Sequence, residues 1–236
     1  MALAWMTLDS VATGEGPLEL RCRGGRDYLI TVAGRVLMSS AAHRSEVALG
    51  ELACAGLAGR RSPKVLVGGL GMGYTLRTIL DLLPRGGRVR VVEINPTVVG
   101  WCRGPLAGLT DRAVADPRVT VEVADVAHVV RRFARAGGEA WDAVVLDLYQ
   151  GPHLSSRRRD HPLYGTAAVE ATRRALRPGG VFAVWGEDHD PGFEKALRHA
   201  GFSVRVHRPV TGARRHVVYL GRAPGGRRAR RGSRRG

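Results

Sequence analysis

A glycine-rich segment and three carboxylates are the residues of this sequence whose types and spacing can do chemistry. The segment Gly68-Gly69-Leu70-Gly71-Met72-Gly73 stands between an apolar run and a stretch with helical spacing. Glycines let a backbone turn tightly and approach a ligand closely, and the helix that follows offers free N–H groups and the positive end of its dipole. Because the segment contains no Gly-Lys-Ser/Thr, it does not predict a loop that cradles a nucleoside triphosphate.

The three carboxylates each follow an apolar run. Glu93 stands about 20 residues after the glycines, the spacing at which a carboxylate binds both ribose hydroxyls, and Asp125 and Asp147 follow the next two runs. In open α/β sheets, ligands bind beyond the carboxyl ends of the strands, so we expect Gly69, Glu93, Asp125 and Asp147 to surround a nucleoside. The alternative is a tight turn with solvated or helix-capping acids. Without a motif for phosphates, the pattern favours S-adenosylmethionine over a dinucleotide.

The elements that position these residues alternate between strand and helix from Lys64 onward. Apolar runs predict strands at 64–69, 88–94, 118–123, 141–147 and 181–185. Helical spacing predicts helices at 74–83, from 96, from 126, at 165–176 and from 191 to about 200, with Asn95 and Asp190 as caps. The runs 202–207 and 216–220, with Gly212 between them, predict an antiparallel edge hairpin. The fold class is therefore α/β, with a doubly wound, mostly parallel, Rossmann-like sheet of seven strands, as in methyltransferases.

The first 60 residues have a different pattern. Tyr28–Val32 and Arg35–Met38 predict a small hairpin, and a helix is expected from about 43 to 57. We therefore divide the chain into an N-terminal hairpin and helix at 1–60, a nucleotide-binding catalytic domain at 61–221, and a disordered arginine-rich tail at 222–236.

Composition favours a cytoplasmic enzyme. The chain has 236 residues and is 44% hydrophobic, which suffices for one substantial core. It has neither the roughly 18 apolar residues of a membrane span nor a basic start typical of a signal peptide. Its three cysteines, Cys22, Cys54 and Cys102, show no disulfide or zinc spacing and are interpreted as reduced thiols.

The net charge of +16 raises the alternative of a nucleic-acid partner. Seven arginines of the segment 222–236 contribute much of this charge, and without them the net charge is +9. The main interpretation of the tail is a solvated extension, and a weak contact with nucleic acid or other anions is the alternative. A homodimer is a further expectation, whereas neither a membrane partner nor a metal is expected.

Several motifs together resemble the spermidine synthase family, over roughly residues 27–221. They are Val65–Arg77 (VLVGGLGMGYTLR), Val91–Asn95 (VVEIN), Ala124-Asp125, Val144–Pro152 (VVLDLYQGP), Leu163–Thr166 (LYGT) and Leu176–Gly180 (LRPGG). The N-terminal hairpin, with Ser45-Glu46 on the next helix, is similar as well. The resemblance implies that the glycine loop, including Gly69, Gly71, Met72 and Gly73, holds the methionine part of the nucleotide. It further implies that Glu93 holds the ribose and Asp125 the adenine amino group.

The sequence also departs from that family. An aspartate of the family's glycine loop falls on Met72, and a family tyrosine is replaced by Arg44. The family's gate loop, here residues 147–164, carries two aspartates three apart. The first is Asp147, and the second, which the resemblance makes the catalytic base, falls on Gln150. Binding a dication needs opposing carboxylates, and an amide cannot act as a base, so we expect no spermidine formation at the family's rate.

The gate loop has further polar residues. Tyr149 and His153 are alternative proton acceptors, and Arg157, Arg158 and Arg159 could meet an anionic substrate or form a solvated loop with Asp160 and His161. Glu187-Asp188-His189-Asp190 resembles a metal cluster in composition, but helix capping by Asp190 explains it better.

Three functions follow. The main hypothesis is a transferase that moves a methyl group from S-adenosylmethionine to an unknown small-molecule acceptor, with Asp147, Tyr149 and Gln150 as catalytic candidates. The alternative is aminopropyl transfer from decarboxylated S-adenosylmethionine. The third is a non-catalytic nucleotide- or nucleic-acid-binding protein.

Overall fold

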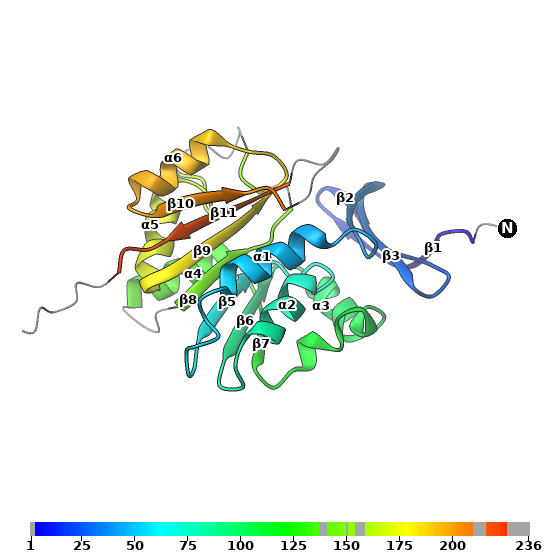
Figure 1. The fold of residues 1–236 in the computed structure, drawn as a ribbon. Coiled ribbons are helices and arrows are strands. Elements are labelled where there is room, and N and C mark those ends of the chain that lie inside the picture. Colours follow the sequence, from blue (N-terminus) through cyan, green and yellow to red (C-terminus); the bar gives the residue numbers. More distant parts are fainter. Residues whose placement is uncertain (1–2, 137–140, 150, 154–158, 210–215, 226–236) are drawn as a thin grey trace, which may run out of the picture.

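The computed structural model describes residues 3–136, 141–149, 151–153, 159–209 and 216–225. A seven-stranded sheet forms the body of the molecule, and a separate four-stranded sheet projects from it (Figure 1). Within the described residues, no helix is both long enough and apolar enough to cross a membrane.

The large sheet has the strand order β10-β11-β9-β8-β5-β6-β7. Its strands are β5 (Lys64–Gly68), β6 (Arg88–Glu93), β7 (Val119–Val123), β8 (Trp141–Leu146), β9 (Leu176–Gly186), β10 (Ser203–His207) and β11 (Val217–Arg222). The five strands from β7 to β9 run parallel, and β11 pairs antiparallel with both β9 and β10. The central strand β8 is buried along its whole length, as its continuous apolar run predicts for a parallel strand covered on both faces.

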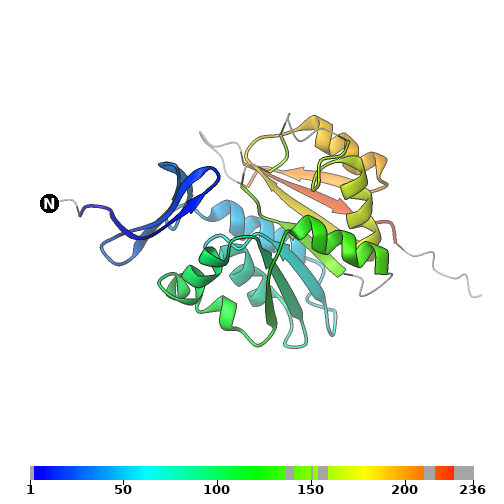
Figure 2. The same ribbon diagram turned by 180° about the vertical axis from the view of Figure 1, so that it is seen from behind.

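Helices cover both faces of this sheet (Figures 1 and 2). One face carries α1 (Arg44–Cys54), α2 (Tyr74–Leu82) and α3 (Pro96–Arg103), and the other carries α4 (Val126–Ala136), α5 (Thr166–Ala175) and α6 (Pro191–His199). Two short 3-10 turns, Ala107–Thr110 and Ala113–Ala115, connect α3 to β7. The predicted caps are confirmed: Asn95 Oδ1 accepts from the Thr97 amide at 2.9 Å, and Asp190 Oδ1 accepts from the Gly192 amide at 2.7 Å.

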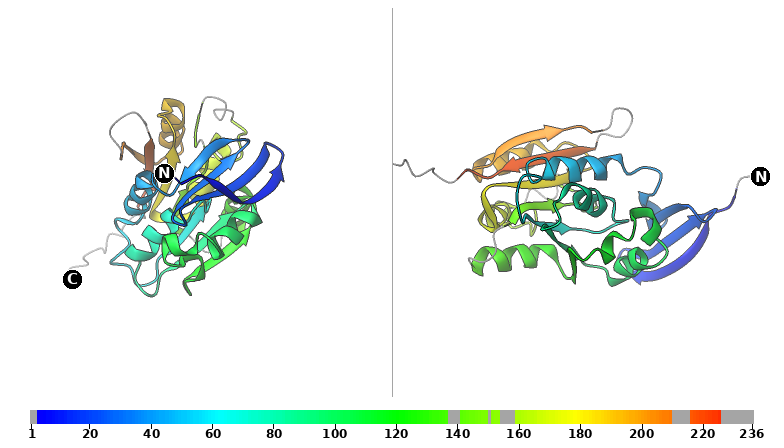
Figure 3. Two further views of the ribbon diagram at one scale, coloured as in Figure 1. Left: turned by 90° about the vertical axis from the view of Figure 1, so that its right-hand side faces the viewer. Right: turned by 60° about the horizontal axis from the view of Figure 1, so that its bottom comes forward.

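The small sheet lies at one end of the large one (Figures 1 and 3). Its strands are β1 (Met6–Thr13), β2 (Gly16–Arg23), β3 (Asp27–Val32) and β4 (Arg35–Ser39), paired antiparallel in that order. The inner side chains of Leu18, Leu20, Ile30 and Val32 join the apolar core shared with α1 to α3. Trp101 Nε1 on α3 donates to Asp9 Oδ2 on β1 at 2.7 Å, which ties the outermost strand to the body.

The predicted fold class is confirmed, with three local differences. The expected N-terminal hairpin is β3–β4, but β1 and β2 extend it to a four-stranded sheet. The fifth strand of the body begins at Leu176 rather than Val181, directly after α5, so Arg177-Pro178-Gly179-Gly180 belongs to β9 and does not form a separate turn. β11 continues to Arg222, and Ala223 N donates to Gly180 O, so ordered pairing passes the expected start of the tail.

Division of the chain at residues 60 and 221 remains a prediction. α1, which we grouped with the hairpin, packs on α2, β8, β9 and β11 of the body. Residues 226–236 of the predicted tail, and Gly212 in the expected turn, lie outside the described residues.

A buried carboxylate fastens the amino-terminal edge of the large sheet. Asp142 on β8 is fully buried, and its Oδ2 accepts from the Lys64 amide at 2.8 Å, joining β8 to β5. Arg60 lies 2.7 Å from Oδ1, as a charge pair without good hydrogen-bond alignment, and Arg177 lies 3.4 Å from Oδ2. One carboxylate therefore ties three segments together.

Replacing this carboxylate should destabilise the fold. Asp142→Ala leaves the Lys64 amide without its acceptor and two arginines without their partner, so we expect the free energy of unfolding to fall by about 2–3 kcal/mol. Asp81→Ala is the control, because Asp81 is 61% exposed and pairs with Arg77 one helical turn away on the surface of the same helix. Urea unfolding of both variants checks this, and equal losses would contradict the assigned role.

Candidate active site

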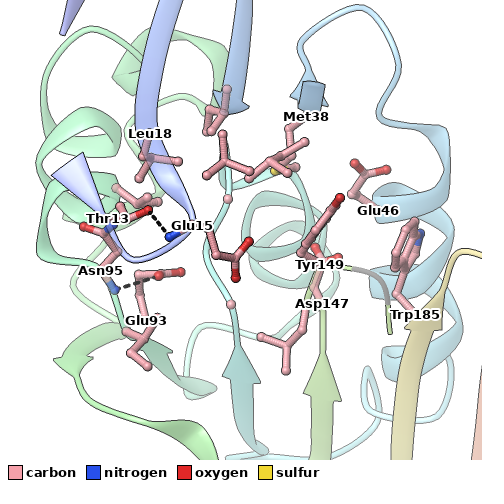
Figure 4. Close-up of a pocket in the computed structure, with 18 of the residues that line it drawn as sticks. Thr13, Glu15, Leu18, Met38, Glu46, Glu93, Asn95, Asp147, Tyr149 and Trp185 are labelled. Atoms are coloured by element: carbon pink, nitrogen blue, oxygen red, sulfur yellow. Dashed lines mark hydrogen bonds between the residues drawn. The ribbon is translucent and has the colours of Figure 1, made fainter. Parts of the chain in front are cut away.

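A cavity of about 570 Å³ lies between the small sheet and the carboxyl ends of the parallel strands (Figure 4). Its roof comes from the small sheet and includes Leu18, Ile30, Val32, Leu37 and Met38. Its floor comes from the loops after β5, β6 and β8. Four carboxylates line it, those of Glu15, Glu46, Glu93 and Asp147, and no lysine, arginine or histidine is among its described lining residues.

The glycine loop forms the centre of the floor in a conformation that needs glycine. Gly69 has φ +88°, and a Cβ at this position would lie 2.1 Å from the carbonyl oxygen of Asp147. Gly71 has φ +51°, and a Cβ there would lie 2.3 Å from Met38 Sδ. The loop therefore lets β8 and the small sheet approach β5 closely, while Gly69 and Gly71 face the cavity.

Glu93 ends β6 beside this loop and is buried, with 8% of its surface exposed. Its Oε2 accepts from the Leu70 amide at 2.9 Å, and its Oε1 accepts from the Asn95 amide at 2.9 Å. These bonds fix the carboxylate in one orientation at the cavity wall (Figure 4). Since a carboxylate oxygen can accept more than one hydrogen bond, Glu93 retains the capacity to bind ligand hydroxyls.

Asp147 and Glu46 both line the cavity on the side away from Glu93 (Figure 4), and the charge of Glu46 acts on Asp147. Thr75 on α2 joins them, since its Oγ1 donates to Asp147 Oδ2 at 2.6 Å and lies 3.2 Å from the carbonyl oxygen of Glu46. Ser45 Oγ donates to Glu46 Oε2 at 2.6 Å. In the described part of the chain, neither carboxylate has a cation within 4 Å.

This environment makes Asp147 a group that titrates near neutrality. Burial and then the negative charge of Glu46 raise the pKa of Asp147 from 3.8 to about 7, against the opposing effect of the Thr75 hydrogen bond. The side chain of Asp147 is half-buried, and its exposed part faces the cavity. The surrounding protein therefore still removes much of its contact with water. Burial and the charge of Asp147 raise the pKa of Tyr164, which stays neutral in this range.

The mouth of the cavity is formed by residues from both sheets. The turn between β1 and β2 places Glu15 over the floor, between Glu93 and Asp147 in Figure 4. Arg35 on β4 lies 3.7 Å from Glu15 and 5.6 Å over the ring of Tyr149. Because Glu15, Arg35 and Tyr149 are exposed, this contact between the two sheets is weak.

The structure brings together some of the residues predicted from the sequence and separates others. Gly69, Gly71, Glu93, Asp147 and Tyr149 line the cavity. Met72 is fully buried in the apolar core, and Gly73 begins α2 with φ +88°, so neither lines the cavity. Asp125 Oδ1 accepts from the Ala127 amide at 2.8 Å at the start of α4, also away from the lining.

Two lining carboxylates were not assigned to the site from the sequence, namely Glu15 and Glu46. Glu15 lies in the turn between β1 and β2, two strands that were not predicted, and Glu46 drew notice only beside Ser45 in the family resemblance. The cavity therefore has carboxylates that the sequence reasoning did not count, and the expectation of no spermidine formation at the family's rate stays a prediction. Gln150, Arg157 and Arg158 lie outside the described residues, and Arg159 and His153 do not line the cavity.

The metal alternative at 187–190 has a structural explanation. Asp190 caps α6, and His189 Nε2 lies 2.9 Å from Glu194 Oε2. No group of three or more potential ligands among the described residues could hold a metal ion.

The stability cost of the close approach at Gly69 can be measured separately from the cost of its positive φ. Gly179→Ala introduces a side chain at φ +75° into open space, which should cost about 1 kcal/mol of stability. Gly69→Ala has a similar φ but also forces Cβ against the Asp147 carbonyl, so we expect a clearly larger loss in thermal unfolding. If the two variants unfold alike, the floor is less tightly packed than described.

The raised pKa of Asp147 predicts a pH-dependent stability. Because the folded protein holds this proton more tightly than the unfolded chain, Asp147 destabilises the fold increasingly as pH rises from about 4 to about 7. Asp147→Asn removes this loss of stability, and the asparagine can still accept the hydrogen bond from Thr75. We therefore expect the variant to gain melting temperature relative to wild type at pH 8 but not at pH 4. Asp81→Asn should show no such pH-dependent difference.

Comparison with known proteins bears on the fold. No protein-family model and no curated protein sequence matches the chain. Among solved structures, the spermidine synthase from Thermotoga maritima superposes with a TM-score of 0.68 and 20% identity, over 92% of this chain and 72% of that one. A spermidine synthase in complex with the transition-state analogue AdoDATO superposes with a TM-score of 0.67 and 20% identity, over 92% of this chain and 72% of that one. A probable spermidine synthase from Corynebacterium glutamicum superposes with a TM-score of 0.67 and 18% identity, over 92% of this chain and 79% of that one. The chain therefore has the fold of the spermidine synthases, as its motifs indicated.

Proposed function

We propose that this protein is a transferase that moves the aminopropyl group of decarboxylated S-adenosylmethionine to a cationic amine. The observation that carries the proposal is the charge of the cavity. Four carboxylates and no cationic side chain line it among the described residues, and Arg35 pairs with Glu15 only at its exposed mouth. The complex of a similarly folded spermidine synthase with AdoDATO supports the same class of ligand.

The cavity charge bears on which nucleotide binds. S-adenosylmethionine carries an α-carboxylate, which would need a cation or several hydrogen-bond donors once removed from water. Its decarboxylated form carries a sulfonium and a primary ammonium, and both gain energy from nearby carboxylates. The charge of the cavity therefore favours aminopropyl transfer over methyl transfer. Methyl transfer, our main hypothesis from the sequence, becomes the second candidate.

The residues present can carry the required proton transfer. Asp147 would take a proton from the bound ammonium, which frees the nitrogen lone pair to attack the carbon next to the sulfonium. The carbon–sulfur bond then breaks, and its electron pair stays on sulfur as a neutral thioether. A carboxylate with a pKa near 7 suits this step better than an ordinary aspartate. Asp147 thus offers a base that does not depend on Gln150.

Glu93 is the residue best placed to hold the nucleoside. Its orientation by two backbone amides pre-organises both oxygens at the wall formed with Ile94, Asn95 and Val98. The role of Asp125 at the adenine remains a prediction, since its carboxylate caps α4 outside the cavity lining.

The compartment is proposed from the three cysteines. Cys22, Cys54 and Cys102 are all buried and unpaired with one another, which favours a reducing compartment such as the cytoplasm. A homodimer and a weak contact of the arginine-rich segment with nucleic acid or other anions stay predictions.

Calorimetry with three ligands tests the proposal. We expect wild-type protein to bind decarboxylated S-adenosylmethionine and methylthioadenosine, and to bind S-adenosylmethionine at least about tenfold more weakly because of the unpaired carboxylate. Glu93→Ala should weaken all three by about 1.5–3 kcal/mol for each hydrogen bond lost to the ribose.

Other outcomes are equally informative. Tighter binding of S-adenosylmethionine than of its decarboxylated form would favour the methyltransferase. Failure to bind any of the three would reject a nucleotide-dependent transferase and leave the non-catalytic alternative.

A further inference from the structure

Glu46 is a buried carboxylate that the proposed reaction has not yet used. It lies in the first turn of α1 with 9% of its surface exposed, and the part that is exposed lines the cavity. The Ser45 hydroxyl satisfies Oε2 at 2.6 Å, whereas no described residue hydrogen-bonds Oε1. Burying a carboxylate oxygen that has no partner among the described residues is costly, and this oxygen is available to a ligand in the cavity.

The carboxylate of Asp147, in the loop after β8, is held in the same way, by one hydroxyl group on one of its two oxygens. Its Oδ2 is occupied by the Thr75 hydroxyl, and its Oδ1 has no hydrogen-bond partner among the described residues. The shared contact of Thr75 Oγ1 with Asp147 and with the Glu46 carbonyl fixes β8, α1 and α2 relative to one another. Each carboxylate is therefore held by one hydroxyl and has one oxygen left for a ligand in the same cavity.

We propose that Glu46 and Asp147 form a two-carboxylate clamp for the reacting ammonium of the acceptor, with Glu46 as a specificity-determining residue. This inference rests on the proposed function and names how that site recognises its amine. An ammonium has three N–H donors and so can serve both free oxygens at once. Its positive charge also compensates two anions that the described protein leaves uncompensated.

The clamp also explains why Asp147 can act as a base near neutrality. The charge of Glu46 opposes ionisation of Asp147 and contributes to its raised pKa. When Asp147 takes the proton, the nitrogen becomes neutral and nucleophilic, while the Glu46 carboxylate stays beside the acceptor and its developing positive charge. No proton, electron or atom is required beyond those of the two substrates.

The other groups around the pair do not replace Glu46. Burial and the charge of Glu46 raise the pKa of Tyr74 on α2, and Tyr164 is likewise kept neutral. His43, stacked on Tyr74 at 4.0 Å, has Nδ1 2.8 Å from the Ser40 carbonyl. Arg44 is exposed, and Glu15 and Glu93 add negative charge from the other side of the cavity.

Glu46→Gln tests the clamp, with Glu51→Gln as the matched control because Glu51 is an exposed position of the same helix. Putrescine is the probe amine. Its Kd is measured by calorimetry in the presence of methylthioadenosine, and its KM and the pH profile of kcat/KM are measured with decarboxylated S-adenosylmethionine.

We expect Glu46→Gln to weaken putrescine binding by about tenfold or more, the usual effect of losing one charge-assisted hydrogen bond. The acidic limb of kcat/KM should move to lower pH, because removing the charge of Glu46 lowers the pKa of Asp147. The Kd of methylthioadenosine should change less than about twofold, a result that a merely structural role would not give. Glu51→Gln should match wild type throughout.

The outcomes separate the clamp from the reaction. If Glu46→Gln leaves the putrescine Kd and the acidic limb unchanged in an active enzyme, the clamp is wrong and the proposed function survives. If the amine binds in a Glu46-dependent way without turnover, the clamp stands and aminopropyl transfer fails. Absence of amine binding in the wild type overturns both.

Discussion

The carboxylates of Glu46 and Asp147 line the same cavity, partly removed from water, and are held by the hydroxyls of Ser45 and Thr75 respectively. Two like charges in such a place repel one another and resist desolvation, and the raised pKa of Asp147 is the direct consequence. Much of the surrounding structure serves to keep these groups together. α1 supplies Glu46, the loop after β8 supplies Asp147, and α2 supplies the Thr75 hydroxyl, which contacts the Asp147 carboxylate and the Glu46 backbone carbonyl.

Close packing of the floor makes this arrangement feasible. Gly69 lets β5 and the end of β8 come so near that a side chain would meet the Asp147 carbonyl, and Asp147 N donates to Gly68 O at 2.8 Å. Glu93 is fixed by backbone amides on the next strand, so the nucleoside end and the acceptor end of the cavity are built on one rigid sheet edge. The small sheet adds an apolar roof, which limits the access of water and strengthens the charges beneath it.

The sequence predicts the parallel body well because each central strand is an apolar run ended by glycine or an acid, and because α3 and α6 begin after recognisable side-chain caps. It predicts β1 and β2 poorly, because β1 is largely exposed and lacks alternating burial. At the site, Glu93 and Asp147 follow from their positions at strand ends. Glu46 does not, since its contact with the cavity depends on how α1 packs across the sheet. The burial of the Met72 side chain in the core is likewise not visible in the glycine spacing, because it depends on how the loop packs against the helices.

The most direct test of this account is a carbon-13 NMR titration of the Asp147 carboxyl, assigned by comparison with Asp147→Asn. We predict a pKa near 7 in the free protein, falling by at least about one unit when putrescine and methylthioadenosine are bound, because the ammonium stabilises the charged form. An Asp147 that titrates near the ordinary aspartate value of 3.8 in both states would contradict the central claim.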